Sequence, residues 1–220
     1  MTVRAILFDM DGTLIDSEPL HQRALQAVLA GEGVTAPPGF DHASTGLSMP
    51  AAYALLSATT KLTLAYEPLV AAKYAAFLER AHELRLRDGA AAALAAVRAM
   101  SCAWAVVSNS DRMLVGASLA ATGLLHPDMI SVTRNDVREG KPAPEPYLRA
   151  AWLLGVAPAD CIVVEDSPAG ATAGLAAGMT VVAWPEPHRG DLVFPDAARR
   201  CNSGDLAGFL LKIKDDDVSR

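Results

Sequence analysis

The stretch Ile6-Leu7-Phe8-Asp9-Met10-Asp11-Gly12-Thr13-Leu14 decides how the rest of the chain is interpreted. An apolar run leads directly into two aspartates spaced two residues apart, and a glycine follows. In a β-strand, residues i and i+2 point to the same side, so we expect Asp9 and Asp11 to project together where the strand ends. Two carboxylates aimed at one point repel each other unless a cation or a proton relieves the repulsion. A metal, a nucleophilic carboxylate and a second carboxylate for proton transfer would make a phosphoryl-transfer site.

The composition is that of a globular protein with a full core. Of the 220 residues, 51% are hydrophobic and 20% are charged, which leaves room for one large domain with an insertion. The net charge of −6 argues against nucleic acid or an anionic membrane as a partner, although a local cationic pocket can still bind an anionic substrate. We find no signal peptide and no membrane-spanning run. Three cysteines without metal-ligand spacing favour reduced thiols in a cytoplasmic protein.

Nearly continuous apolar runs predict strands that are buried on both faces of a parallel sheet. They lie at residues 5–8, 103–107, 161–164 and 180–183, with a weaker run at 129–133. Alanine-rich segments between them predict helices at residues 89–100, 112–122, 145–154 and 168–177. This alternation predicts an α/β fold, a doubly wound parallel sheet with a Rossmann-like core.

One segment interrupts the alternation. Residues 16–87 show helical patterns at 21–30, 50–60 and 67–84, punctuated by glycine and proline. We therefore expect a core domain of residues 1–15 and 88–220, and an inserted α-helical cap domain of residues 16–87. The insertion follows the first strand, at the edge of the sheet where ligands bind, so it is placed to act as a lid. We expect residues 212–217, near the carboxyl end, to form a frayed, solvated end.

Polar segments follow the second strand and a later loop. Ser108, Asn109, Ser110 and Asp111 precede a predicted helix, where hydroxyls and backbone N–H groups can bind phosphate, although plain N-capping by Ser110 or Asp111 is the alternative. Lys141 lies in a proline-rich loop. It could bind phosphate or neutralise the paired carboxylates, or it could be an ordinary surface lysine.

Two adjacent acids end the strand at 161–164. Glu165 and Asp166 supply the carboxylate oxygens that Mg²⁺ prefers, and Ser167 then begins a helix. Capping of that helix by Asp166 or Ser167 is the alternative. Capping does not explain why both acids terminate an apolar strand.

The order of these segments resembles the haloacid dehalogenase superfamily of phosphohydrolases. The four motifs are Asp-x-Asp-Gly-Thr at 9–13, Ser-Asn at 108–109, Lys-Pro at 141–142 and Glu-Asp-Ser at 165–167. The resemblance covers almost the whole chain, including the helical insertion, which looks like the small cap of the phosphatase and β-phosphoglucomutase branch.

The resemblance implies roles for the acidic residues. Asp9 would be the nucleophile that forms an aspartyl-phosphate, Asp11 the general acid and then base, and Lys141 the balancing cation. An aspartate at position 11 favours phosphate over carbon–halogen chemistry. The Mg²⁺ ligands implied by the resemblance are Asp9, the Asp11 backbone carbonyl, Asp166, and Glu165 directly or through water.

Phosphate and substrate contacts are also implied. The serine–asparagine segment supplies phosphate-binding residues, namely Ser108, Asn109 and Ser110. In the cap, His21 could face the site or lie on the helix surface, and Gly46 and Ser48 lie in what resembles the substrate-specificity loop.

Met49 separates the candidate activities within this branch. β-Phosphoglucomutases have an arginine directly after the loop serine to hold a second phosphate, and this chain has Met49. The resemblance therefore favours a Mg²⁺-dependent phosphatase that hydrolyses a small phosphorylated metabolite, such as a sugar phosphate. We expect the protein to be a monomer. A mutase-like phosphoryl transfer and a non-catalytic phospho-ligand-binding regulator are the alternatives. Cleavage of a phosphonate would need a lysine in the cap, for which Lys61 and Lys73 are candidates by composition only. A serine hydrolase is excluded because the loop has Pro50 in place of the last glycine of the Gly-x-Ser-x-Gly motif.

Overall fold

The chain divides into two compact units. The computed structural model describes residues 3–40, 49–201 and 204–218, with side chains described as far as residue 214. Unit 1 comprises Met1–Asp16 and Arg85–Arg220, and unit 2 comprises Ser17–Leu84. None of the helices in the described ranges combines the length and hydropathy that a membrane span requires.

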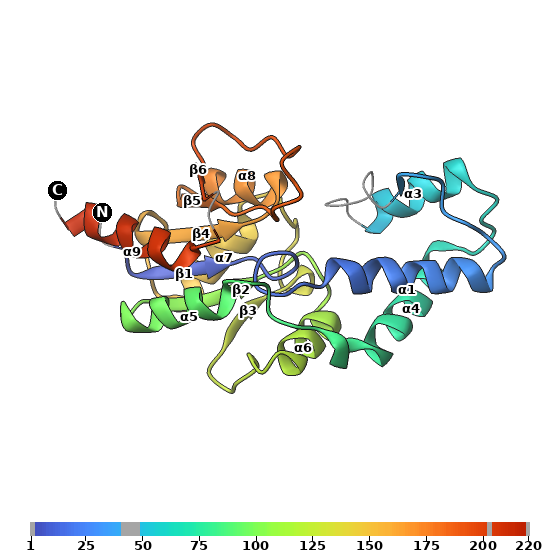
Figure 1. The fold of residues 1–220 in the computed structure, drawn as a ribbon, viewed down its shortest axis with the longest axis horizontal. Coiled ribbons are helices and arrows are strands. Elements are labelled where there is room, and N and C mark those ends of the chain that lie inside the picture. The colour runs from blue at the N-terminus through green and yellow to red at the C-terminus, as the bar shows by residue number, and fades with distance from the viewer. Residues whose placement is uncertain (1–2, 41–48, 202–203, 219–220) are drawn as a thin grey trace. The chain divides into compact units, whose positions relative to one another are not determined.

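Unit 1 is built on a parallel sheet with helices on both sides (Figure 1). The strand order is β3-β2-β1-β4-β5-β6, and each neighbouring pair is parallel. The strands are β1 (Ala5–Phe8), β2 (Ala103–Val107), β3 (Ile130–Val132), β4 (Cys161–Glu165), β5 (Thr180–Ala183) and β6 (Arg199–Arg200). The predicted doubly wound fold is confirmed, and only the two-residue edge strand β6 carried no sequence signal.

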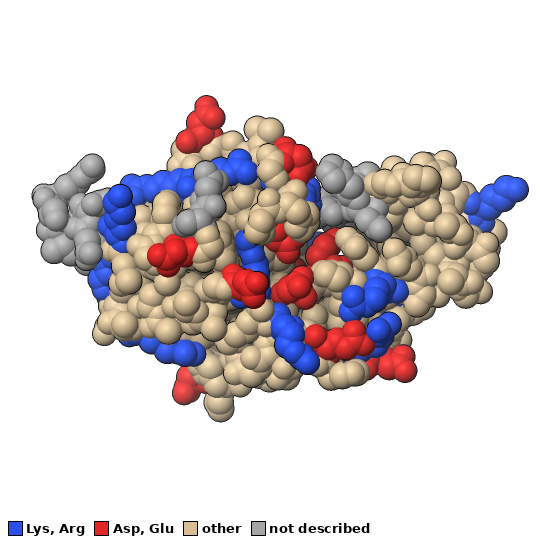
Figure 2. Space-filling view, viewed as in Figure 1, with Lys and Arg blue, Asp and Glu red and all other residues tan. Residues whose placement is uncertain are grey.

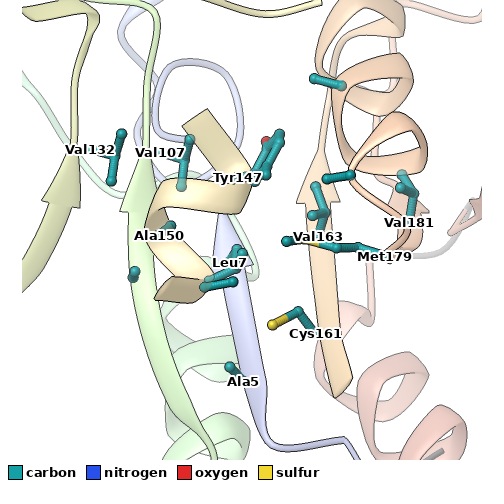
Figure 3. Packing of buried hydrophobic residues seen from close by; sticks show 14 of the residues in the cluster. Ala5, Leu7, Val107, Val132, Tyr147, Ala150, Cys161, Val163, Met179 and Val181 are labelled. Carbon is teal, nitrogen blue, oxygen red and sulfur yellow. The ribbon is translucent and has the colours of Figure 1, made fainter. Parts of the chain in front are cut away.

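In the described part of unit 1, four helices lie between strands in the sequence, and a fifth follows the last strand. They are α5 (Ala90–Ala99), α6 (Arg112–Ala121), α7 (Glu145–Leu154), α8 (Pro168–Ala176) and α9 (Leu206–Val218), with short 3₁₀ turns η2 (Arg134–Asp136) and η3 (Pro158–Asp160). Tyr147 and Ala150 of α7 lie among Leu7, Val107 and Val163 of three strands (Figure 3). The residues between these on the strands point to the opposite face and are also buried, which is why the strands have no alternating pattern.

The carboxyl-terminal segment corrects one expectation. Residues 212–217 belong to helix α9, so the prediction of a frayed end is wrong. Leu206, Leu210 and Ile213 are spaced as one face of a helix, and all three are buried. Lys214 Nζ donates to the Met100 carbonyl, at the end of α5. The apolar spacing, rather than the charged residues around it, decides the structure here.

Unit 2 is helical. Its helices are α1 (Glu18–Gly31), α3 (Met49–Thr59) and α4 (Tyr66–Glu79), followed by a 3₁₀ turn η1 (Ala81–Glu83). The helix predicted at residues 67–84 is therefore too long, because α4 ends at Glu79. Some of the buried apolar residues of this unit form a small cluster: Leu25, Leu29, Phe40, Leu56 and Leu69.

Surface charge is mixed. On the face of the described structure drawn in Figure 2, lysines and arginines occur together with aspartates and glutamates, and no continuous basic surface is present.

The topology explains why distant motifs meet. Strand β1 lies between β2 and β4, with Phe8 paired to Val106 on one side and to Val164 on the other. All three strands run in one direction, so their carboxyl ends reach the same edge of the sheet. Asp9, Ser108 and Glu165 stand at those ends, and this edge is therefore the candidate site.

Candidate active site

The first aspartate follows β1 at a tight turn. The Asp9 backbone N–H donates to the Val164 carbonyl at 3.0 Å, which extends the pairing of β1 with β4 by one residue. Gly12 has a φ of +77°, and a Cβ added there would lie 2.4 Å from Asp166 Oδ2. A glycine is therefore required both for the backbone conformation and for the close approach of the second acidic segment.

Lys141 binds two acids at once. Its Nζ lies 2.5 Å from Asp9 Oδ1, 2.6 Å from Glu165 Oε1 and 2.8 Å from the Val107 carbonyl oxygen. These three acceptors match the three protons of an ammonium group. The Lys141 side chain is only 4% exposed, so the surface-lysine alternative is wrong. Burial by itself lowers the pKa of Lys141, but the charges of Asp9 and Glu165 outweigh it and raise that pKa, so the ammonium stays charged.

The loop that carries Lys141 is fixed by Asn109. The Asn109 side-chain amide donates to the Lys141 carbonyl at 3.0 Å, and its Oδ1 accepts from the Lys141 backbone N–H at 2.8 Å. A Cβ added at Gly140 would lie 2.6 Å from Asn109 Oδ1, so the glycine makes room for this contact. Asn109 therefore positions the lysine, whatever further contact it makes with a phosphate.

Asp11 is held by two hydroxyls. Ser108 Oγ donates to Asp11 Oδ2 at 3.1 Å, and Ser110 Oγ donates to the same oxygen at 2.8 Å. The Ser110 backbone N–H in turn donates to Ser108 Oγ. The hydroxyl of Ser110 thus faces Asp11 instead of capping α6.

The two acids at the end of β4, Glu165 and Asp166, each have a carboxylate oxygen close to one of Asp9. Asp166 Oδ1 accepts from Thr13 Oγ1 at 3.1 Å. Burial, with the charge of Glu165 adding to it, raises the pKa of Asp166 to about 7. Burial is also the largest cause that raises the pKa of Asp9, although Lys141 opposes it. Ser167 does cap α8, because its Oγ accepts from the Gly170 backbone N–H, but Asp166 takes no part in that cap.

These acids fit a hard cation. Each of Asp9, Glu165 and Asp166 offers one carboxylate oxygen, and the three oxygens lie within 4.8 Å of one another. Burial and mutual repulsion make the ionised forms of Asp9 and Asp166 costly, and a divalent cation would remove that cost. Oxygen donors of this kind suit Mg²⁺, Mn²⁺ or Ca²⁺ rather than a soft metal.

Two residues of the site have no motif that sequence reasoning could use. Arg87 is buried and donates to the carbonyls of Gly12, Trp184 and Pro185 at 2.6 to 2.7 Å, and its guanidinium stacks 3.8 Å from the Trp184 ring centroid. Burial lowers the pKa of Arg87, while the charge of Asp166 opposes that effect. The Tyr147 hydroxyl donates to Glu165 Oε1 at 2.6 Å. In the sequence, Tyr147 lies on the apolar face of the helix that follows Lys141. That position indicates that the side chain is packed in the core, but it does not indicate a contact with Glu165.

The remaining candidate residues belong to unit 2 or lie outside the described residues. His21 is on α1, where its ring stacks on Phe77 with 4.3 Å between ring centroids. Gly46 and Ser48 lie outside the described residues. The site described here therefore consists of unit 1 residues.

Comparisons with known proteins identify the family. A family model described as haloacid dehalogenase-like hydrolase matches residues 3–178. Hexitol phosphatase A of Escherichia coli is 34% identical over 192 residues, which cover 83% of each chain, and 6-phosphogluconate phosphatase of the same organism is 32% identical over 200 residues, which cover 88% of each. The crystal structure of CbbY from Rhodobacter sphaeroides in complex with phosphate matches with a TM-score of 0.82 and 27% identity, covering 94% of this chain and 97% of that chain. The resemblance drawn from the sequence is confirmed: the chain belongs to the haloacid dehalogenase-like hydrolases, as a phosphatase-like member.

Proposed function

We propose that the chain is a Mg²⁺-dependent phosphatase that hydrolyses a small phosphorylated metabolite through an aspartyl-phosphate. The observation that carries the proposal is the buried Lys141 ammonium, which bridges Asp9 and Glu165 at 2.5 and 2.6 Å. It places a fixed positive charge beside the candidate nucleophile, where a phosphoryl group would bring negative charge. The phosphatase relatives support the reaction type.

Asp9 is suited to attack phosphorus without a base. Burial raises the pKa of Asp9 and the charge of Lys141 only opposes this rise, so a bound divalent cation would be needed to favour the ionised form. An ionised carboxylate oxygen is a nucleophile without help from a base. A bond forms between an Asp9 oxygen and phosphorus while the bond from phosphorus to the leaving oxygen breaks, and the electron pair goes to that oxygen. Bound Mg²⁺ would neutralise charge on the phosphoryl oxygens.

Asp11 is suited to move the proton. A protonated Asp11 gives its proton to the leaving oxygen and later takes one from the water that attacks the aspartyl-phosphate. Ser108 and Ser110 both donate to Oδ2 of Asp11 and so fix the orientation of its carboxyl group for proton transfer. Release of inorganic phosphate returns Asp9 to its starting form.

Unit 2 is proposed as the cap that selects the substrate and excludes water during the reaction. His21, Gly46 and Ser48 are the residues that the family resemblance assigns to substrate contact there. The relatives act on a hexitol phosphate and on 6-phosphogluconate by name, so the proposed substrate class is sugar phosphates and related phosphorylated polyols and acids.

A phosphoglucomutase-like transfer is the second candidate, and one contact in unit 2 favours it. Lys73 Nζ lies 3.2 Å from Met49 Sδ, so a cation reaches the position where the mutases have an arginine. The CbbY structure with xylulose-(1,5)bisphosphate matches this chain with a TM-score of 0.81 and 27% identity, and its ligand has a second phosphate. We place the phosphatase first because a thioether at position 49 binds no anion. The intact acidic site argues against a non-catalytic regulator.

The test is phosphate release from a panel of phosphorylated metabolites. The panel contains hexitol phosphates, 6-phosphogluconate, a ketose bisphosphate and hexose 1-phosphates, each with Mg²⁺, and Asp9→Asn is the control. Rapid release from one substrate class by the unmutated protein alone supports the phosphatase. Isomerisation of a hexose 1-phosphate without net phosphate release favours the mutase. If the protein catalyses neither hydrolysis nor isomerisation, the result favours the regulator.

A further inference from the structure

The carboxylate of Glu165 is already occupied by protein donors. Its Oε1 accepts from Lys141 Nζ and from the Tyr147 hydroxyl, each at 2.6 Å. Its Oε2 accepts from the Ser167 hydroxyl at 2.9 Å and from the Ser167 backbone N–H at 3.3 Å. An ionised carboxylate offers about four lone-pair positions, so these four donors use all of them.

The surroundings prevent this carboxylate from turning away. Glu165 is fully buried, and a Cβ added at Gly170 would lie 1.7 Å from Glu165 Oε1. Only a glycine at position 170 therefore leaves room for the carboxylate in this position. Rotation of Glu165 toward a metal would leave the buried donors of Tyr147 and Ser167 without their acceptor, which is costly.

Asp166 differs from its neighbour in each of these respects. It is partly exposed, its Oδ1 accepts from the Thr13 hydroxyl, and its Oδ2 lies against the Gly12 turn. The two adjacent acids at the end of β4 therefore have different surroundings, which indicates different roles, although both lie near Asp9.

We propose that Glu165 anchors Lys141 instead of binding the metal directly, and that Tyr147 is a positioning residue that fixes this anchor. The proposal rests on the proposed function, because it concerns how the lysine is held against Asp9. Asp9 and Asp166 are then the side chains that would hold a metal directly.

Tyr147 is built for this task. It is fully buried on α7, and its ring is packed among residues of the sheet (Figure 3). The Lys141 ammonium lies 5.1 Å from the Tyr147 ring centroid, so the ring face also attracts the cation. Burial raises the pKa of Tyr147 well above its usual value, which keeps the phenol protonated and able to donate. The hydroxyl and the ammonium share one oxygen of Glu165, so loss of the hydroxyl lets Glu165 and Lys141 shift together.

The test is the Tyr147→Phe variant, which keeps the ring and removes only the hydroxyl. We expect kcat to fall about tenfold, because the cation loses its alignment with the phosphoryl group. We expect KM and the Kd for Mg²⁺ to stay within about twofold, with the Kd measured by calorimetry on metal-free protein. If Tyr147 had only a structural role, the variant would not lower kcat while leaving the Kd for Mg²⁺ unchanged.

Tyr53→Phe is the matched control. The Tyr53 hydroxyl donates to the Leu64 carbonyl at 3.0 Å within unit 2, so this variant loses one hydrogen bond of similar length far along the chain from the site motifs. We expect its kcat to equal that of the unmutated protein. A comparable loss of thermal stability in both variants then shows that stability alone does not lower kcat.

Two results overturn the proposal: a Tyr147→Phe variant with an unchanged kcat, or one whose Mg²⁺ affinity falls fivefold or more. If the unmutated protein hydrolyses nothing in the panel, the proposed function fails, and binding of beryllium trifluoride with Mg²⁺ tests the positioning role instead, since this anion mimics a phosphoryl group on a carboxylate. A tenfold weaker binding in Tyr147→Phe, at unchanged Mg²⁺ affinity, supports the role. Equal binding by both proteins, or none by either, overturns it.

Discussion

The sheet edge of unit 1 and the helices of unit 2 are stabilised by different interactions. At the edge, the charged groups of Asp9, Lys141 and Glu165 are buried and bonded to one another. In unit 2, the ion pair between Arg23 and Glu83 has side chains that are 42% and 34% exposed, and the buried cluster is small and apolar. Exposed ion pairs contribute little, whereas a broken buried pair is costly.

The two regions therefore differ in the substitutions that they tolerate. Buried charges need their partners at fixed distances, so substitutions at the edge of unit 1 are expected to remove activity or stability outright. An apolar cluster accepts other residues of similar volume, so unit 2 can change its sequence and keep its helices. We therefore expect unit 1 to determine the reaction and unit 2 to determine the substrate.

The largest effect is expected from Asp9→Asn. An amide does not attack phosphorus, so kcat should fall about a thousandfold or more while the circular dichroism spectrum is unchanged. Asp128→Asn, on the surface between α6 and β3, is the control and should be fully active. Residual turnover near that of the unmutated protein would remove the covalent mechanism.

Arg87→Met tests whether unit 1 depends on its buried cation for stability. Three backbone carbonyls would lose their donor, so we expect a loss of roughly 3 to 5 kcal/mol in the free energy of unfolding, measured by urea titration. Arg98→Met on the exposed side of α5 should cost less than about 0.5 kcal/mol. Similar midpoints for the two variants would contradict the contrast drawn between buried and exposed charges.

The metal and the pH should act together on unit 1. Burial raises the pKa of Asp166 from near 3.8 to about 7, so between these values the folded state holds a proton that the unfolded state has released. Stability of the metal-free protein should therefore fall as the pH rises from 5 to 8. Mg²⁺ should raise Tm by several degrees more at pH 8 than at pH 5, and should restore activity after treatment with EDTA.

The control for this pH effect is Asp166→Asn, which should lose most of the difference between the two pH values. An equal Mg²⁺ shift of Tm at both pH values in the unmutated protein would show that the raised pKa is not linked to metal binding. Full activity in the presence of EDTA would contradict the metal site itself.

The smallest effect is expected in unit 2, from Met49→Arg. An arginine beside Lys73 should increase kcat/KM for a bisphosphate relative to a monophosphate by about five- to tenfold, and should leave hydrolysis of a small generic ester nearly unchanged. Met113→Arg, on the exposed surface of α6, is the control. Equal changes on all substrates would mean that residue 49 does not face the substrate.

The sequence predicts the sheet well because its strands are buried on both faces. A run such as residues 103–107 has no polar member to obscure it, and it lies as predicted in β2. Strand β6 is two exposed arginines and has no pattern to detect. The sequence predicts a frayed tail where α9 forms, because the charged residues at 212 and 214–217 mask the helical spacing of Leu206, Leu210 and Ile213.

The candidate site is predictable to the extent that chain order brings residues to strand ends. Lys141 was a plausible surface lysine in sequence, and only the fold places its ammonium between two acids. Arg87 and Tyr147 lay beyond prediction because their partners are backbone carbonyls and a carboxylate far along the chain. Such partners leave no periodicity or spacing in the sequence.

The outermost strand has a consequence for how the molecules behave in concentrated solution. Open sheets can recruit a strand from another molecule along an unpaired edge, and long, flat, apolar edges are the most exposed to this process. At one edge of this sheet, β6 offers only Arg199 and Arg200, both exposed, and the Arg200 guanidinium lies over the Phe194 ring. Two like charges on so short a strand repel a second copy of themselves, so this edge protects the protein against aggregation.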